Sequence, residues 1–132
     1  MKYLSEDTAK QYSPLTLAFL GDSVYEIQVR CALTAEANRP VGSLHSEKIR
    51  YVCAAFQARA ADFLQDAMND AELAVYRRGR NAGGTPSKNA DPADYRKATG
   101  FEAVFGYLYL TGNTERIEML FGTVWENKEC FL

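Results

Sequence analysis

The 132-residue chain is poor in histidine and cysteine, and this scarcity limits the chemistry open to it. It has one histidine, and its three cysteines, Cys31, Cys53 and Cys130, are widely spaced and never form a C-x-x-C pair. The pattern excludes the usual zinc cages and a paired disulfide framework, so we expect the cysteines to be small buried residues or free thiols. Any metal ion must therefore be held by carboxylate oxygens, which favour Mg²⁺ or Mn²⁺ over softer ions.

Long apolar runs are also absent. No stretch reaches the roughly 18 uninterrupted apolar residues that a membrane span needs, and the N-terminus, MKYLSEDTAKQYS, lacks the apolar region of a secretory signal. We therefore expect a soluble cytoplasmic protein with no membrane partner. With 47% apolar residues and no low-complexity tract, residues 1–132 are expected to form one domain with a substantial core.

The chain lacks the alternating pattern of β-strands, and helical periodicity runs through most of it. Capping residues and prolines predict helices at about 14–37 after Ser13, 44–68 after Ser43 with one break, 71–80 after Asn69 or Asp70, 92–111 after Asp91, and 115–127 after Thr114. The segment NAGGTPSKNADP at residues 81–92 is rich in turn-forming residues and is expected to be an exposed loop. We predict an all-α fold of about five to seven helices.

Two acidic residues stand out because they lie on apolar faces of predicted helices. At about 100° per residue, the neighbours of Asp22 on the helical wheel are mostly apolar: Leu15, Ala18, Glu26, Val29 and Leu33. Burying the charge of Asp22 would be costly unless a cation, a hydrogen-bond donor or water compensated it. Glu102 has a similar setting, beside Ala98 and Gly106. The small residues allow either close helix packing or room for a metal ion. The structural alternative is an ion pair or a capped polar contact between packed helices.

Positive charge is concentrated in one segment, although the whole chain has a formal net charge of −2. Residues 77–97 contain six basic and two acidic residues, a net charge of +4, and the rest of the chain carries −6. An anionic partner would meet the protein here, although a solvated surface of basic side chains is the simpler interpretation. The basic group that we consider for phosphate contact comprises Arg77, Arg78, Arg80, Asn81, Lys88, Arg96 and Lys97.

The segment FLGDSVYE at residues 19–26 resembles the first signature block of the ribonuclease III family, and GFEAVFGYLYL at 100–110 resembles the second. The order and separation of the blocks also fit, and the similarity extends over about residues 13–126. The resemblance implies a helical endonuclease domain that acts as a homodimer on double-stranded RNA, with carboxylates holding Mg²⁺, or Mn²⁺ in its place. It identifies Asp22 and Glu102 as the catalytic metal ligands. Glu26, one turn after Asp22, would support that ligand or pair with an arginine.

Two positions depart from the family pattern. Ala18 and Thr99 stand where the blocks commonly carry a glutamate and an aspartate, so half of the usual carboxylate set is missing. Either the activity is lost, or Mg²⁺ keeps more of its own waters and binds through one or two carboxylates, which is the interpretation we prefer. Thr99 would then lie next to the metal ligands and support them without binding the metal ion itself.

The chain is also similar to the Mini-ribonuclease III branch of the family. It shares the segment RGRNA, followed by a lysine-bearing loop and a tyrosine-rich helix. That branch lacks a separate double-stranded RNA-binding domain. The resemblance therefore implies that the basic group must itself hold the RNA backbone.

The resulting hypothesis is a Mg²⁺-dependent endoribonuclease that matures a ribosomal RNA precursor near the ends of the large-subunit RNA. This substrate is implied by the resemblance to the branch alone. The first alternative, prompted by Ala18 and Thr99, is a catalytically silent scaffold of the same fold that binds RNA or ribosomal particles. The acidic net charge keeps open a third class, a helical interaction protein with no nucleic-acid role.

Overall fold

The computed structural model of the protein describes residues 2–86 and 88–132, so Met1 and Ser87, the latter in the predicted loop, lie outside the described residues. The helices are α1 (Glu6–Lys10), α2 (Pro14–Glu36), α3 (Val41–Val52), α4 (Ala54–Leu64), α5 (Asp70–Arg80), α6 (Pro92–Leu110) and α7 (Thr114–Glu126), with 3₁₀ turns η1 (Gln65–Ala67) and η2 (Lys128–Phe131). No strand occurs within the two described ranges. The predicted all-α fold is confirmed.

Several helix starts follow the predicted signals. α2 begins at Pro14, directly after Ser13, although the Ser13 side chain makes no capping hydrogen bond. Asn69 forms a reciprocal capping box at the start of α5, and the Asp91 side chain accepts a hydrogen bond from a backbone N–H in the first turn of α6. These local signals predict where the helices that carry the candidate site begin.

Two predicted caps are wrong, and one helix was not predicted. Pro40, with φ of −55°, precedes the first residue of α3, so this helix starts earlier than a cap at Ser43 would allow. Thr114 is itself the first residue of α7, and Asn113 is its cap. The unpredicted helix, α1, has five residues, too few for a periodic pattern, and Ser5 caps it.

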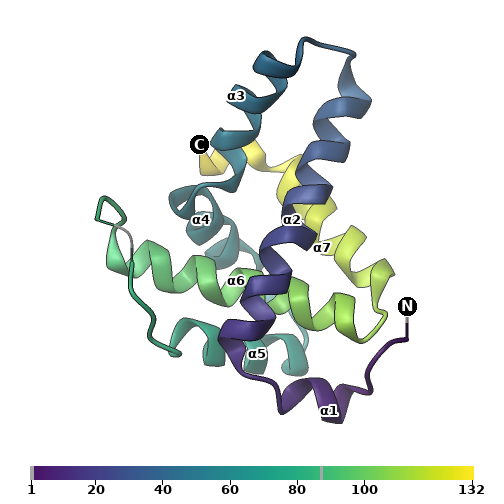
Figure 1. Ribbon diagram of the computed structural model, residues 1–132, viewed down its shortest axis with the longest axis vertical. Coiled ribbons are helices and arrows are strands. Elements are labelled where there is room, and N and C mark those ends of the chain that lie inside the picture. The colour runs from purple at the N-terminus through teal and green to yellow at the C-terminus, as the bar shows by residue number, and fades with distance from the viewer. Residues whose placement is uncertain (1, 87) are drawn as a thin grey trace.

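α6 is the central helix of the fold. Figure 1 shows α2 passing across it, and α4 and α5 also pack against it. Ten of the 19 residues of α6 are buried, which explains why its sequence is apolar on nearly every side. α3 folds back beside α2, where the hydroxyl of the buried Tyr25 donates to the backbone carbonyl of Tyr51 at 2.7 Å. The ring of Tyr25 packs edge-on against Phe101 of α6, with 5.0 Å between the ring centroids.

Two glycines bring α2 and α6 into backbone contact where they cross. A Cβ atom added at Gly21 would overlap the backbone carbonyl of Glu102 and lie 2.8 Å from the backbone nitrogen of Gly106. A Cβ atom added at Gly106 would overlap the backbone carbonyl of Leu17. Larger residues at either position would force the helices apart. Because Asp22 directly follows Gly21, the crossing fixes it beside the turn of α6 that carries Glu102.

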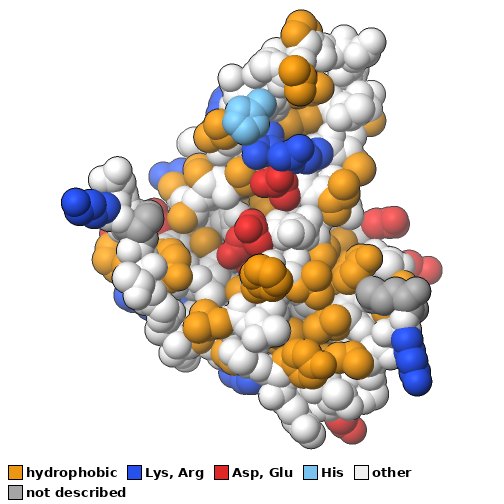
Figure 2. Space-filling model, in the orientation of Figure 1, with side chains coloured by type: hydrophobic (Ala, Val, Ile, Leu, Met, Phe, Trp, Pro, Cys, Tyr) orange, Lys and Arg blue, Asp and Glu red, His pale blue; other side chains and the backbone are white. Residues whose placement is uncertain are grey.

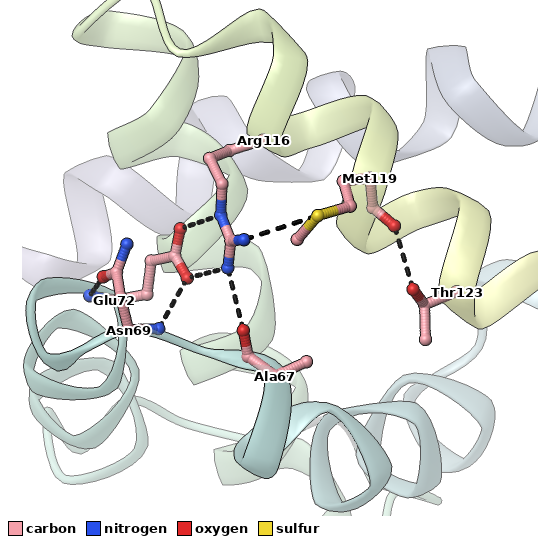
Figure 3. Close-up of polar contacts among 6 residues, drawn as sticks. All are labelled: Ala67, Asn69, Glu72, Arg116, Met119 and Thr123. Carbon is pink, nitrogen blue, oxygen red and sulfur yellow. Dashed lines mark hydrogen bonds and ion pairs between the residues drawn. The ribbon is translucent and has the colours of Figure 1, made fainter.

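A buried ion pair joins the start of α5 to the start of α7 (Figure 3). Arg116 donates from Nε to Glu72 Oε2 at 2.8 Å and from Nη2 to Glu72 Oε1 at 2.6 Å. The Glu72 side chain is 1% exposed, and its Oε1 also accepts from the backbone N–H of Asn69 at 3.0 Å. Since both carboxylate oxygens are bonded, the buried charge is compensated, and α5, which carries Arg77, Arg78 and Arg80, is anchored at its N-terminal end.

The cysteines and the hydropathy of the helices agree with the sequence analysis in part. All three cysteines are exposed and free, so the free-thiol interpretation is confirmed and the buried one is wrong. Among the described residues, no helix combines the length and the apolar character that crossing a membrane requires.

Candidate functional site

The crossing of α2 and α6 brings together the two carboxylates that the sequence singles out. Asp22 is exposed on α2, and Glu102 is half-buried on α6. Burial, together with the negative charge and the hydrogen bond of Asp22, raises the pKa of the Glu102 carboxyl to about 8. In the described part of the chain, neither carboxylate forms an ion pair with a lysine or an arginine. The described residues therefore do not form the ion pair of the structural alternative, whereas Asp22 and Glu102 do make a polar contact between the packed helices.

This pair of carboxyl groups fits a hard cation. When both groups are ionised they repel each other, and a divalent cation bound to both removes that repulsion. The described residues contain no group of three or more His, Cys, Asp and Glu side chains that could hold a metal ion, so the site has two carboxylates. Mg²⁺ commonly binds through one or two carboxylates and keeps several of its own waters. Asp22 and Glu102 are thus the residues that could hold Mg²⁺ or Mn²⁺.

The neighbours of the pair do not replace the missing carboxylates. Ala18 is buried and has no polar side-chain atom, and the Thr99 hydroxyl donates to a backbone carbonyl one turn earlier at 3.0 Å. Glu26 pairs with Arg30 at 2.8 Å and with Lys48 at 3.5 Å. The Glu26 side chain thus makes the arginine pair that the sequence analysis left open, and the Thr99 hydroxyl donates its one proton to the backbone of its own helix.

Sequence reasoning missed one polar residue beside the pair. Gln57, on α4, is 2% exposed, and its Nε2 donates to the backbone carbonyl of Val52 at 3.0 Å. The amide also contacts the Glu102 carboxyl and lowers its pKa, against the larger effects of burial and of Asp22. Gln57 Oε1 has no hydrogen-bond partner among the described residues. In the sequence, Gln57 is a lone amide in an alanine-rich helix, and nothing there indicates a partner on α6.

Some members of the basic group are already bound within the protein. Arg78 donates to the backbone carbonyls of Lys10 and Tyr12 at 2.6 and 2.9 Å, so it holds the end of α1 against α5. Lys97 pairs with Asp62 at 2.9 Å, a hydrogen-bonded contact that raises the pKa of the lysine. These side chains have structural partners that RNA would have to displace.

Other members of the basic group face solvent. Arg77, Lys88 and Arg96 are exposed, and their side chains form no ion pair or hydrogen bond within residues 2–86 and 88–132. Arg80 is half-buried with its guanidinium 5.7 Å from the ring centroid of Tyr76, and its Nε lies 3.4 Å from the side-chain oxygen of Asn81. The exposed members are the best placed to meet a phosphate backbone.

Exposed apolar side chains share the surface of α2 with Asp22. Phe19 is 82% exposed, and Leu15 and Ile27 are exposed as well. Leu15, Phe19 and Asp22 follow one another at helical spacing, so they lie on one face. Figure 2 shows acidic side chains in the middle of the visible face, with hydrophobic side chains below them and basic side chains above. Apolar surface beside a charged site is typical of a contact region.

Known proteins match this chain over most of its length. Residues 15–113 match the family model of the Ribonuclease III domain. The "Mini-ribonuclease 3" of Thermoanaerobacter sp. (strain X514) is 42% identical over 116 residues, covering 87% of this chain and 82% of that protein. The "Mini-ribonuclease 3" of Symbiobacterium thermophilum is 50% identical over 105 residues, covering 79% and 81%. In fold, the chain is similar to an X-ray structure of a Fusobacterium nucleatum protein, with a TM-score of 0.81, 24% identity and coverage of 89% and 95%.

Proposed function

Since the chain belongs to the ribonuclease III family, we propose that it is a Mg²⁺-dependent endoribonuclease that cleaves double-stranded RNA. The observation that carries the proposal is the convergence of Asp22 and Glu102 from distant parts of the chain. They meet at a helix crossing where no basic side chain of the described residues neutralises them. Mn²⁺, which has the same preference for oxygen ligands, would serve in place of Mg²⁺.

The two proposed ligands lie in different surroundings. Bound Mg²⁺ would supply an activated water and stabilise the charge that develops on the phosphate. Glu102 is fixed on the central helix at a backbone contact, whereas Asp22 is exposed and open to the RNA. Because the pKa of Glu102 is raised to about 8, this carboxyl is mostly protonated at neutral pH without a cation. It must release that proton to become a ligand, so metal binding is favoured as the pH rises.

The basic group would hold the RNA backbone next to this site. A-form RNA is recognised mainly through its phosphates and 2′-hydroxyls, and such contacts weaken steeply with salt. Arg77, Lys88 and Arg96 are our first candidates because they are exposed and unpaired within the described chain. The remaining members of the basic group would mainly hold the backbone that carries these three exposed side chains; they are Arg78, Arg80, Asn81 and Lys97.

We also propose that the protein works as a homodimer through the apolar face of α2. Phe19 and Leu15 leave apolar area in water beside Asp22, and a second copy would bury it. A dimer would present two sites to a duplex, and each site would cut one strand. Residues 1–132 would form one nuclease domain in each protomer.

The finer substrate assignment rests on the similarity to proteins named Mini-ribonuclease 3. On that basis we propose a precursor of large-subunit ribosomal RNA in the cytoplasm. A catalytically silent RNA-binding scaffold is the second candidate. It is favoured by one observation, that neither Ala18 nor Thr99 offers the site a carboxylate.

A cleavage assay on wild type and Asp22→Ala tests these proposals together. With a long RNA duplex, wild type should give defined fragments in Mg²⁺ and none in chelator, while Asp22→Ala should bind the duplex without cutting it. Asp7→Ala, which removes an exposed aspartate from α1, is the matched control and should cut normally. Wild type that binds duplex but never cuts with any divalent ion is a scaffold. Wild type that fails to bind at low salt belongs to the third class, with no nucleic-acid role.

A further inference from the structure

We propose that Gln57 is a positioning residue of the cation site: its amide nitrogen holds the Glu102 carboxyl, and its unpaired Oε1 offers a hydrated cation a neutral oxygen. The inference rests on the proposed function because it concerns the same pair of carboxylates. Gln57 lies on α4, outside both segments that resemble the family's signature blocks, and so adds a third helix to the site.

The chain itself sets the orientation of the Gln57 amide. Val52 is the last residue of α3, so its backbone carbonyl has no partner within its own helix and needs a donor. Only the NH₂ end of an amide can donate, so Nε2 faces Val52 at 3.0 Å and Oε1 is the other end. An amide nitrogen carries two N–H groups, and the second is available to the Glu102 carboxyl that the amide contacts. Glu102 is thus held from α4 as well as from α2.

The unpaired oxygen is the feature that packing alone does not explain. Gln57 is 2% exposed and its Oε1 has no partner among the described residues, which is unfavourable for a buried acceptor. A leucine of similar size would remove the unpaired oxygen, but it would also leave the Val52 carbonyl without its donor. Oε1 belongs to the same amide group that contacts the Glu102 carboxyl, so it lies in the neighbourhood of the candidate cation site. A water molecule of a hydrated Mg²⁺ is a donor that would satisfy it.

The residues around the two carboxylates explain why a neutral oxygen from Gln57 would help to bind a hydrated cation. Ala18 supplies no oxygen, and the Thr99 hydroxyl, which donates its proton to its own helix, supplies no charge, so no third carboxylate supports Asp22 and Glu102 at these positions. A neutral amide adds an acceptor for metal-bound water without adding a third negative charge to a pair that already repels. Outer contacts of this kind orient metal ligands, and their loss typically weakens metal affinity about 10- to 100-fold.

Titration of the folded protein with MgCl₂, followed by thermal unfolding, tests the inference without relying on cleavage. In Gln57→Leu, the Mg²⁺ concentration for half of the maximal rise in Tm should increase about 10-fold. Its Tm in chelator should fall, because the Val52 carbonyl loses its donor, so the Mg²⁺ titration is compared with the variant's own Tm in chelator. In Gln57→Glu, a third carboxylate should lower Tm in chelator and reduce the Mg²⁺ concentration required. Tyr107→Phe, which removes another buried and unpartnered oxygen, is the matched control and should leave the Mg²⁺ titration unchanged.

The outcomes separate this inference from the function on which it rests. If wild type responds to Mg²⁺ and Gln57→Leu responds at the same concentrations, the inference is overturned and the proposed function stands. If Gln57→Leu does not fold, the Mg²⁺ titration of Gln57→Glu tests the inference instead. If Gln57→Glu needs the same Mg²⁺ concentration as wild type, the inference is overturned. Wild type that is neither stabilised by Mg²⁺ nor able to cut RNA overturns the proposed function itself.

Discussion

Replacing Glu102 by glutamine should stabilise the metal-free protein at alkaline pH while abolishing RNA cleavage. In the folded protein, burial and Asp22 raise the pKa of Glu102 from 4.5 to about 8. Because the folded state keeps a proton that the unfolded state releases, the free energy of unfolding falls as the pH rises from 4.5 to about 8. At about 1.4 kcal/mol per pH unit, the loss reaches about 3 to 5 kcal/mol once Glu102 is ionised.

Glutamine stays neutral across this range, so metal-free Glu102→Gln should keep nearly constant stability where wild type loses it. At a pH of about 8.5, the Tm of the variant should exceed that of wild type by roughly 10 to 20 °C. Thermal unfolding in chelator, followed by circular dichroism, measures this difference. Added Mg²⁺ should then raise the Tm of wild type at that pH and leave the Tm of Glu102→Gln unchanged, because only wild type retains both ligands.

The matched control is Glu118→Gln, which removes an exposed glutamate from α7. It should follow the wild-type dependence on pH and on Mg²⁺. If the stability of Glu102→Gln fell with pH as steeply as that of wild type, Glu102 would not be the group that retains the proton, and the reasoning would be refuted. A stabilised Glu102→Gln variant that still cuts RNA would remove Glu102 from the catalytic site.

Three further outcomes are expected. Gly21→Ala should cost about 3 kcal/mol or more in urea unfolding, because the added methyl overlaps the α6 backbone, whereas Gly122→Ala, with nothing within 4 Å of its Cβ, should cost little. Phe19→Glu should give a monomer in sedimentation analysis while the Tm of the protomer stays close to its wild-type value. Arg96→Ala should lower the slope of RNA affinity against salt by about 1 in fluorescence anisotropy, whereas Arg78→Ala should instead lower stability, because its contacts are to backbone carbonyls.

The sequence predicts the parts of the fold that depend on local chemistry. Pro14, Asn69 and Asp91 mark helix starts through capping and fixed φ, which are decided within a few residues. The apolar helical neighbours of Asp22 and Glu102 single these two residues out, but they do not predict that two like charges meet. Resemblance to a family then predicts that they meet, as ligands of a metal ion. Local patterns and one resemblance are enough to predict the fold class and this contact.

The rest depends on which helices meet. Arg78 looks like its basic neighbours in sequence, and only the position of α1 decides that it binds the carbonyls of Lys10 and Tyr12. The sequence around Gln57 likewise gives no sign of its role, which depends on the packing of α4 on α6 that places the amide beside Glu102. Both roles arise from contacts between elements that no periodic pattern encodes.

The missing carboxylates and the buried amide are consistent with one physical trade-off. Each added carboxylate would bind a cation more tightly but would also increase the repulsion in the metal-free protein, and Glu102 already has its pKa raised to about 8. Ala18 and Thr99 limit that repulsion, because neither adds a charge to the crossing of α2 and α6. A neutral oxygen such as that of Gln57 restores part of the support for a hydrated cation without restoring the charge. If Asp22 and Glu102 bind Mg²⁺ as we propose, the fold would depend less on bound metal than with four carboxylates, and more of the cation's coordination would be left to water and RNA.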